Sequence, residues 1–107
     1  MDQINKVDGL SFVIPVFNEE GAVVSTLERV KLVLSTIDVD TEIIVVDDGS
    51  TDNSAQRALS VKGVNVISQP KNAGYGRALK TGIAAARHHW IAIVDADGTY
   101  PIEQLKD

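Results

Sequence analysis

An apolar run that ends in two carboxylates carries the clearest chemical signal in this sequence. Residues 90–94 read Trp-Ile-Ala-Ile-Val and are followed by Asp95, Ala96, Asp97 and Gly98. Side chains at i and i+2 of a strand project to the same side, so Asp95 and Asp97 point the same way. Converging carboxylates repel each other, and Mg²⁺ or Mn²⁺, which prefer hard oxygen ligands, would relieve that repulsion. The alternative is a polar strand exit in which Asp-Gly forms a turn.

A second acidic cluster, Asp-Asp-Gly-Ser-Thr-Asp, begins at Asp47, directly after the apolar run at residues 42–46. Adjacent residues at a strand end face opposite ways. Only one of Asp47 and Asp48 is therefore expected to enter a crevice, while the other caps or anchors the loop. The alternative interpretation is a helix-capping turn after a strand.

Phe17 and Asn18 follow the first apolar run of the chain, residues 10–15. They offer a ring face and an amide to a planar heterocycle. Alternatively, Phe17 is an edge of the core, and Asn18 is only the N-cap of a helix.

A loop with two glycines, GYGRAL at residues 74–79, only superficially matches the dinucleotide fingerprint G-x-G-x-x-G. Its sixth position is Leu79, and it follows the third strand rather than the first. The loop can bring backbone N–H groups and Arg77 or Lys80 near a phosphate. The competing interpretation is a tight turn followed by solvated helix charges. His88 and His89 have no evident partner, so we interpret them as surface or packing residues.

Strands must alternate with helices to position these motifs. β-forming residues predict strands at 10–15, 42–46, 64–68 and 90–94. Helical spacing predicts one helix from Asn18 to about Thr36, a second that begins within residues 50–52 and ends at Gly63, and a third whose inner face is Leu79, Ile83 and Ala86. The near-continuous apolarity of the strands indicates a parallel sheet covered on both faces. All four polar motifs then follow the carboxyl ends of strands, where open parallel sheets bind ligands.

Composition limits the classes of function. The chain has 107 residues, of which 44% are hydrophobic and 23% charged, and its formal net charge is −5. We expect a single domain over residues 1–107. The acidic balance argues against a nucleic-acid partner. The absence of cysteine excludes disulfides and thiolate sites. Because no apolar leader or transmembrane run is present, a cytoplasmic location is expected. The residue pattern predicts the start of a new helix where the sequence stops, so we also expect the domain to be incomplete.

Taken together, the motifs resemble the N-terminal half of glycosyltransferase family 2. The residues that carry the resemblance are FVIPVFNEE at 12–20, IVVDDGSTD at 44–52, NAGYGRAL at 72–79 and VDADGTYP at 94–101. The last motif looks most like the branch that transfers sugars to polyprenyl or dolichyl phosphates. The resemblance implies a GT-A fold. This is an α/β fold with three α/β/α layers and a parallel sheet in the order third, second, first and fourth strand, truncated here after the fourth.

The resemblance also implies a nucleotide-sugar site at the carboxyl ends of the strands. Pro15, Phe17 and Glu19 would line the base and ribose, and Asp48 would bond the base. Asp95 would reach the ribose or a metal, and Asp97 would ligate Mg²⁺ or Mn²⁺ bridging the diphosphate. Further nucleotide-sugar contacts implied at matching positions are Asn18, Gly74, Arg77 and Ala96.

The implied reaction is transfer of a sugar from a UDP- or GDP-linked donor to an acceptor, with inversion. The metal would neutralise the leaving diphosphate. A polyprenyl-phosphate acceptor would place the full-length protein at the cytosolic face of a membrane. In that branch a glutamine often stands two residues after the second aspartate, whereas this chain has Thr99. The catalytic base is expected beyond residue 107.

Two other classes of protein compete with this interpretation. One is a non-catalytic nucleotide-binding or self-associating fragment, because the outer edge of the fourth strand would be unpaired and would favour a homodimer. The other is a receiver-like signalling domain. A receiver carries an acidic pair after its first strand and a phosphoacceptor after its third. Here those strands end in Pro15 and Ser68, which argues against a receiver.

Overall fold

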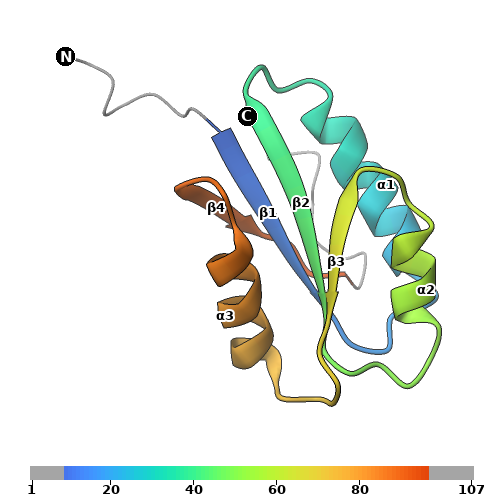
Figure 1. The fold of residues 1–107 in the computed structure, drawn as a ribbon. Helices are drawn as coiled ribbons and strands as arrows, with labels where there is room; N and C mark the ends of the chain where they lie inside the picture. Colours follow the sequence, from blue (N-terminus) through green and yellow to red (C-terminus); the bar gives the residue numbers. More distant parts are fainter. Residues whose placement is uncertain (1–8, 97–107) are drawn as a thin grey trace.

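The computed structural model describes residues 9–96, which form alternating strands and helices (Figure 1). The elements are β1 (Gly9–Val16), α1 (Val23–Leu34), β2 (Asp40–Asp47), α2 (Ser54–Leu59), β3 (Val64–Ser68), α3 (Tyr75–Ala85) and β4 (Trp90–Ile93). No helix among these residues is long and apolar enough to cross a membrane.

The strands form one parallel sheet in the order β3-β2-β1-β4. This is the order that the resemblance implied, and it confirms the predicted fold class. Phe12 of β1 lies opposite Ile43 of β2 and Ala92 of β4. The two central strands read as nearly continuous apolar runs because both of their faces are covered.

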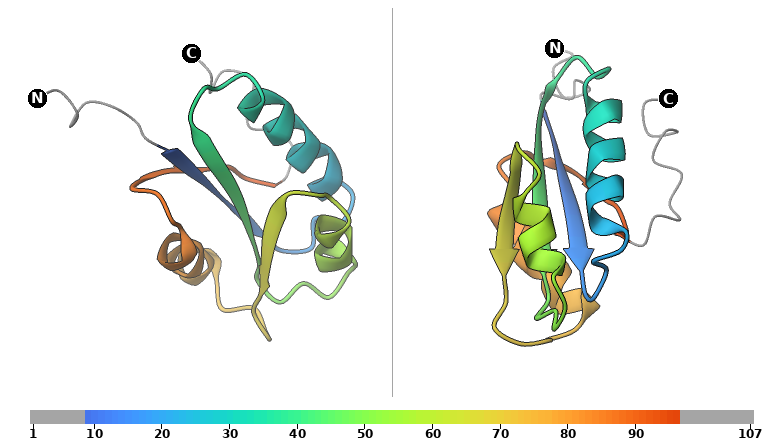
Figure 2. Two further views of the ribbon diagram at one scale, coloured as in Figure 1. Left: turned by 45° about the horizontal axis from the view of Figure 1, so that its top comes forward. Right: turned by 90° about the vertical axis from the view of Figure 1, so that its right-hand side faces the viewer.

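Helices cover both faces of the sheet (Figure 2). On the face covered by α1 and α2, the core is built around Phe12, Ile14, Leu27 and Val45. On the face covered by α3, a smaller cluster contains Ile44, Val46 and Ala78. Alternation along β1 and β2 therefore sends successive side chains into two different cores.

Helix α1 begins at Val23, five residues later than the cap predicted at Asn18. Asn18 has a φ of 53°, which lies outside helical geometry, and its side chain does not cap α1. Instead, the carbonyl of Glu19 accepts hydrogen bonds from the N–H groups of Ala22 and Val23 and forms a separate turn. Similarly, α2 ends at Leu59, before the stop predicted at Gly63.

The inner face of α3 differs in part from the prediction: Ala86, directly after the helix, packs against the core as expected, but Leu79 and Ile83 are not its buried residues. Its buried residues are Ala78 and Gly82, whereas Leu79 is half-buried and Ile83 is 43% exposed. A Cβ at Gly82 would overlap the Cγ1 of Val13 on β1. The helix packs close to the sheet through small residues, and its larger apolar side chains consequently lie outside the core.

The amino-terminal ends of the strands are joined by a polar network. Glu42 Oε2 accepts hydrogen bonds from the Ser11 hydroxyl at 2.5 Å and the Arg87 N–H at 2.6 Å. His88 lies against Gly9, with its Nε2 3.2 Å from Asp40 Oδ2 but without the alignment of a hydrogen bond. This histidine is a packing residue, as predicted.

Candidate functional site

The loops that follow β1, β2 and β3 meet at one end of the sheet, where α3 also begins (Figure 1). Two cavities open there. The first, about 270 Å³, is lined by Pro15, Val16, Phe17, Asp48, Asn72, Gly74, Tyr75 and Ala78. The second, about 280 Å³, is lined by Pro15, Phe17, Glu19, Tyr75, Asp95 and Ala96. Because Pro15, Phe17 and Tyr75 line both, the two cavities are adjoining parts of one cleft, called here the rim cleft.

Asn18 connects the loop after β1 to the loop after β2. Its N–H donates to the Ser50 hydroxyl oxygen at 2.9 Å, and its side-chain Oδ1 accepts from the Thr51 N–H at 2.8 Å. These bonds account for the left-handed backbone of Asn18, a conformation that asparagine tolerates better than most residues. They hold the exposed ring of Phe17 at the rim cleft.

A second set of bonds continues this connection between the two loops. The Glu19 N–H donates to the Ser54 hydroxyl oxygen at 2.8 Å, and the Asn53 N–H donates to Glu20 Oε1 at 2.8 Å. Asp52 Oδ1 accepts from both the hydroxyl and the N–H of Ser54. The hydroxyl bond is the main cause of a lowered pKa for the Asp52 carboxyl. The acidic residues here therefore serve partly to join the loops.

Asp48 anchors the loop that leads into α3. Its Oδ1 accepts from Gln69 Nε2 at 2.6 Å and from the Ala73 N–H at 2.9 Å, and its Oδ2 accepts from the Gly74 N–H at 3.0 Å. The neighbouring Asp47 lines neither cavity of the rim cleft. As predicted, only one residue of the pair, Asp48, lines the cleft. The prediction gave the loop-anchoring role to the other residue, but Asp48 has that role as well.

Gly49 occupies a position where a side chain would not fit. Its φ of 73° is left-handed, and a Cβ there would overlap the backbone of Lys71 and Asn72. The turn after β2 and the loop before α3 are thus in direct backbone contact. This contact and the bonds to Asp48 hold the first cavity in shape.

Tyr75 links α3 to the strand that ends in Asp95. Tyr75 is the first residue of α3 and is 56% exposed. Its hydroxyl donates to Asp95 Oδ1 at 3.3 Å. Partial burial and the negative charge of Asp95 raise the pKa of the Tyr75 phenol above its usual value.

The structure brings most of the predicted nucleotide-sugar residues to the rim cleft. Those that line it are Pro15, Phe17, Glu19, Asp48, Gly74, Asp95 and Ala96. Asn18 and the exposed Arg77 line neither cavity. Residues that sequence reasoning did not single out are Val16, Asn72, Tyr75 and Ala78. Tyr75 could have been found from its place between two glycines, where a large side chain must project from the loop.

The donor atoms at the rim cleft suit a hard cation. Glu19 and Asp95 supply carboxylates to the second cavity. Asp97, the principal metal ligand expected from the sequence, lies outside the described residues. Within residues 9–96 no three acidic, histidine or cysteine side chains form a metal-binding group. Mg²⁺ commonly binds through one or two carboxylates together with substrate phosphates, so this donor set fits a cation that arrives with a diphosphate.

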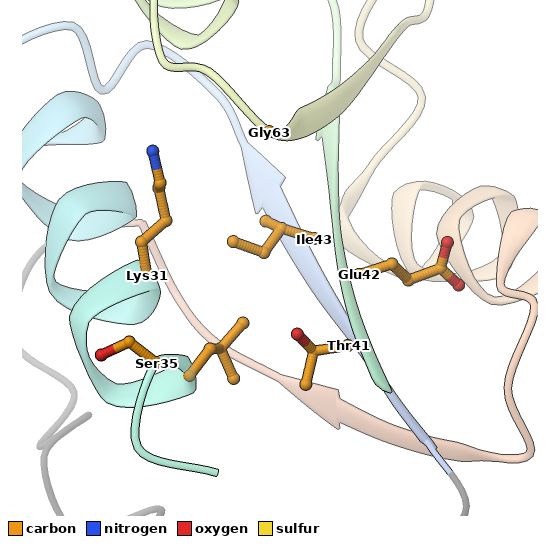
Figure 3. A pocket seen from close by; sticks show the side chains of 7 residues that line it. Lys31, Ser35, Thr41, Glu42, Ile43 and Gly63 are labelled. Carbon is orange, nitrogen blue, oxygen red and sulfur yellow. The ribbon is translucent and has the colours of Figure 1, made fainter. Parts of the chain in front are cut away.

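A third cavity, about 250 Å³, lies at the opposite end of β2. It is lined by residues of α1 and β2 and by Gly63, among them Lys31 and Thr41 (Figure 3). None of the residues predicted to bind the nucleotide sugar lines it. The rim cleft is therefore the candidate site.

The α/β fold and the order of its parallel strands match those of the GT-A glycosyltransferases. The family model "Glycosyl transferase family 2" matches residues 11–107. The chain belongs to glycosyl transferase family 2, as the sequence motifs predicted.

Curated relatives include transferases that act on lipid phosphates. The chain is 34% identical to an undecaprenyl-phosphate 4-deoxy-4-formamido-L-arabinose transferase of Proteus mirabilis, over 98% of this chain and 34% of the relative. It is 33% identical to a dolichyl-phosphate β-glucosyltransferase of Trichomonas vaginalis, over 91% of this chain and 32% of the relative. The chain thus spans about a third of the length of these relatives.

Solved structures of similar proteins contain a nucleotide and a metal. Glucosyl-3-phosphoglycerate synthase of Mycobacterium tuberculosis, crystallised with Mn²⁺, UDP and glucosyl-3-phosphoglycerate, aligns with a TM-score of 0.69 and 30% identity. The alignment covers 88% of this chain and 34% of that enzyme. A further structure of the same enzyme contains Mg²⁺ and UDP.

Proposed function

We propose that the rim cleft binds a nucleoside-diphosphate sugar together with Mg²⁺ or Mn²⁺, and that the chain is the donor-binding part of an inverting glycosyltransferase. The observation that carries this proposal is the convergence of Pro15, Phe17, Asp48 and Asp95 on one cleft. Family membership and the UDP complexes of similar enzymes support it.

The two cavities suit different parts of such a ligand. In the first, the ring of Phe17 and the buried carboxylate of Asp48 offer an apolar face and a hydrogen-bond acceptor to a base. A carboxylate has about four acceptor sites, and three are occupied by Gln69, Ala73 and Gly74. In the second, the carboxylates of Glu19 and Asp95 are placed for a ribose or a cation.

Asp95 and Asp97 would hold the cation, and Arg77 and Asn18 are proposed to contact or support the donor. When bound, a divalent cation supplies Lewis-acid stabilisation of the departing diphosphate. The chain's own contribution is to keep the carboxylates in place and to orient the donor. We assign the catalytic base to residues beyond 107.

A polyprenyl phosphate is the acceptor that we propose. Its support is the similarity to undecaprenyl- and dolichyl-phosphate transferases. An acceptor of this kind would bring the protein to a membrane surface, for which we propose the cytosolic face. The donor base is proposed to be uridine, because the similar solved enzyme binds UDP.

Calorimetric titration of UDP into the chain tests the donor proposal. We expect binding in the presence of Mn²⁺ or Mg²⁺, at least tenfold weaker binding in EDTA, and loss of the metal effect in Asp97→Ala. GDP is the matched competitor that reports base preference. Equal UDP affinity with and without metal, or no UDP binding under either condition, contradicts the proposal.

We further propose that the chain associates with a second copy through β4. Within the described residues β4 pairs only with β1, so one edge of the strand is free. Trp90 and Ile93, at the two ends of β4, are 50% and 38% exposed. A free strand edge flanked by apolar side chains favours pairing with another edge.

A further inference from the structure

The bond between Tyr75 and Asp95 joins the first residue of α3 to the segment that follows β4. Tyr75 belongs to α3, and Asp95 follows β4 on the other side of the rim cleft. Both side chains are exposed, and the bond between them spans 20 residues of sequence. Packing does not require this contact, because neither side chain belongs to either core cluster.

The bond uses only one oxygen of the carboxylate. Tyr75 donates to Oδ1 of Asp95, and within residues 9–96 Asp95 accepts no other hydrogen bond. Oδ2 therefore has no partner among the described residues. A neutral phenol leaves the negative charge of Asp95 in place while it restricts rotation of the side chain. Groups that hold a metal ligand from behind in this way fix its orientation and strengthen binding.

Tyr75 lines both cavities of the rim cleft. The ring and the hydroxyl can therefore have separate roles. The ring can contact a ligand in the cleft, and the hydroxyl is the group that bonds Asp95.

We propose that Tyr75 is a positioning residue that holds Asp95 Oδ1 so that Oδ2 is free for the divalent cation. This inference rests on the proposed function of the rim cleft. A role for the tyrosine ring alone would not depend on the hydroxyl oxygen. Tyr75→Phe removes that oxygen and keeps the ring, so it distinguishes the two roles.

The test separates metal binding from nucleotide binding. Free Mn²⁺ is measured by electron paramagnetic resonance while Mn²⁺ is titrated into the chain at saturating UDP, and UDP affinity in EDTA is measured by calorimetry. For Tyr75→Phe we expect the Mn²⁺ concentration at half-saturation to rise roughly tenfold, with UDP affinity in EDTA unchanged. Ser35→Ala, which removes a hydroxyl that donates to the Leu32 carbonyl at the far end of α1, is the matched control.

A double-mutant cycle shows whether Tyr75 acts through Asp95. In an Asp95→Asn background, adding Tyr75→Phe should leave the weakened Mn²⁺ binding unchanged. Equal Mn²⁺ half-saturation for Tyr75→Phe and the parent chain overturns the positioning role and leaves the donor site standing. Absence of Mn²⁺-dependent UDP binding by the parent chain overturns the donor site, and the positioning role with it.

Discussion

At the residue scale, Asp48 shows how a single carboxylate can both build a cleft and line it. The side chain is 4% exposed, and the backbone N–H groups of Ala73 and Gly74 donate to it. Hydrogen bonds to a charged acceptor are stronger than neutral ones. The carboxylate thus occupies the N–H group of Gly74, which belongs to the loop that the sequence offered as a phosphate contact, and that of Ala73 beside it.

Asp48→Asn is expected to lower the free energy of unfolding by about 2–3 kcal/mol. The asparagine amide has only one acceptor oxygen. Its NH₂ group would therefore face an N–H donor of the loop or of Gln69, and a hydrogen bond would be lost. Urea denaturation followed by circular dichroism measures the loss. Asp38→Asn, at an exposed loop position, is the matched control and should leave the stability within about 0.5 kcal/mol of the parent. Equal stability of the two variants would contradict the anchoring role.

At the element scale, the distance between α3 and the sheet depends on its small residues. Ala78 and Gly82 face the sheet, and a Cβ at Gly82 would meet Val46 Cγ2 at 3.1 Å in addition to overlapping Val13. The valine methyl groups cannot move far, because both valines are fully buried. The position of α3 in turn determines where Tyr75 stands in the rim cleft.

Gly82→Ala should therefore destabilise the fold by about 1–3 kcal/mol through overpacking, despite the better helix propensity of alanine. Gly76→Ala in the same helix is the control, because a Cβ there meets nothing within 4 Å. It should be neutral or slightly stabilising. Chemical denaturation of both variants gives the comparison, and a stabilised Gly82→Ala would show that α3 is not held tightly against β1.

The amino-terminal ends of β1 and β2 and the segment after α3 are joined through Glu42. Burial by itself would raise the pKa of the Glu42 carboxyl, but the Arg87 N–H, the Ser11 hydroxyl and the Arg87 guanidinium outweigh it and lower the pKa below its usual 4.5. A carboxylate with a lowered pKa in the folded state stabilises the fold above the unfolded-state pKa. That stability is lost as the pH falls through the folded-state pKa.

We expect Glu42→Gln to reduce stability at pH 7, and the difference from the parent chain to shrink as the pH is lowered from about 5 toward 3. Urea unfolding at a series of pH values measures this. Glu28→Gln, at an exposed position of α1, should show no such pH-dependent difference. If the difference in unfolding free energy between Glu42→Gln and the parent chain grew on acidification, the pKa of Glu42 could not be lowered in the folded state.

At the scale of the whole molecule, β4 is an edge strand of the sheet that the described residues form, and it carries exposed apolar side chains. Trp90 and Ile93, at the two ends of β4, are the exposed apolar residues of this edge. Leu32 is also exposed, but it lies on α1 rather than on a strand. Within the described residues the outer edges of β3 and β4 both lack a partner strand, and the exposed apolar side chains of β4 make it the place where we expect contact with a second copy.

Sedimentation velocity at increasing protein concentration tests this contact. The parent chain should form dimers or larger species, and Ile93→Lys should shift the population toward monomer, because a charge on an edge strand opposes edge pairing. Leu32→Lys removes an apolar side chain that is 71% exposed on α1 and should leave association unchanged. A parent chain that stays monomeric at high concentration would contradict the self-association proposal.

The sequence by itself determined the order of elements, the parallel sheet, the family and most residues of the rim cleft. The order of elements and the parallel sheet follow from local patterns, because apolar runs specify strands and the polar residues after them gather at one edge of a parallel sheet. The family and the cleft residues are implied by the resemblance of the four motifs to glycosyltransferase family 2. Only the tertiary structure decided which partners each polar side chain has. The residue type and position of Asn18 predict a helix N-cap, yet Asn18 forms hydrogen bonds with Ser50 and Thr51 of another loop. The inner face of α3 was likewise decided by the approach of Val13 to Gly82. Such contacts join residues far apart in the chain, so no local spacing predicts them.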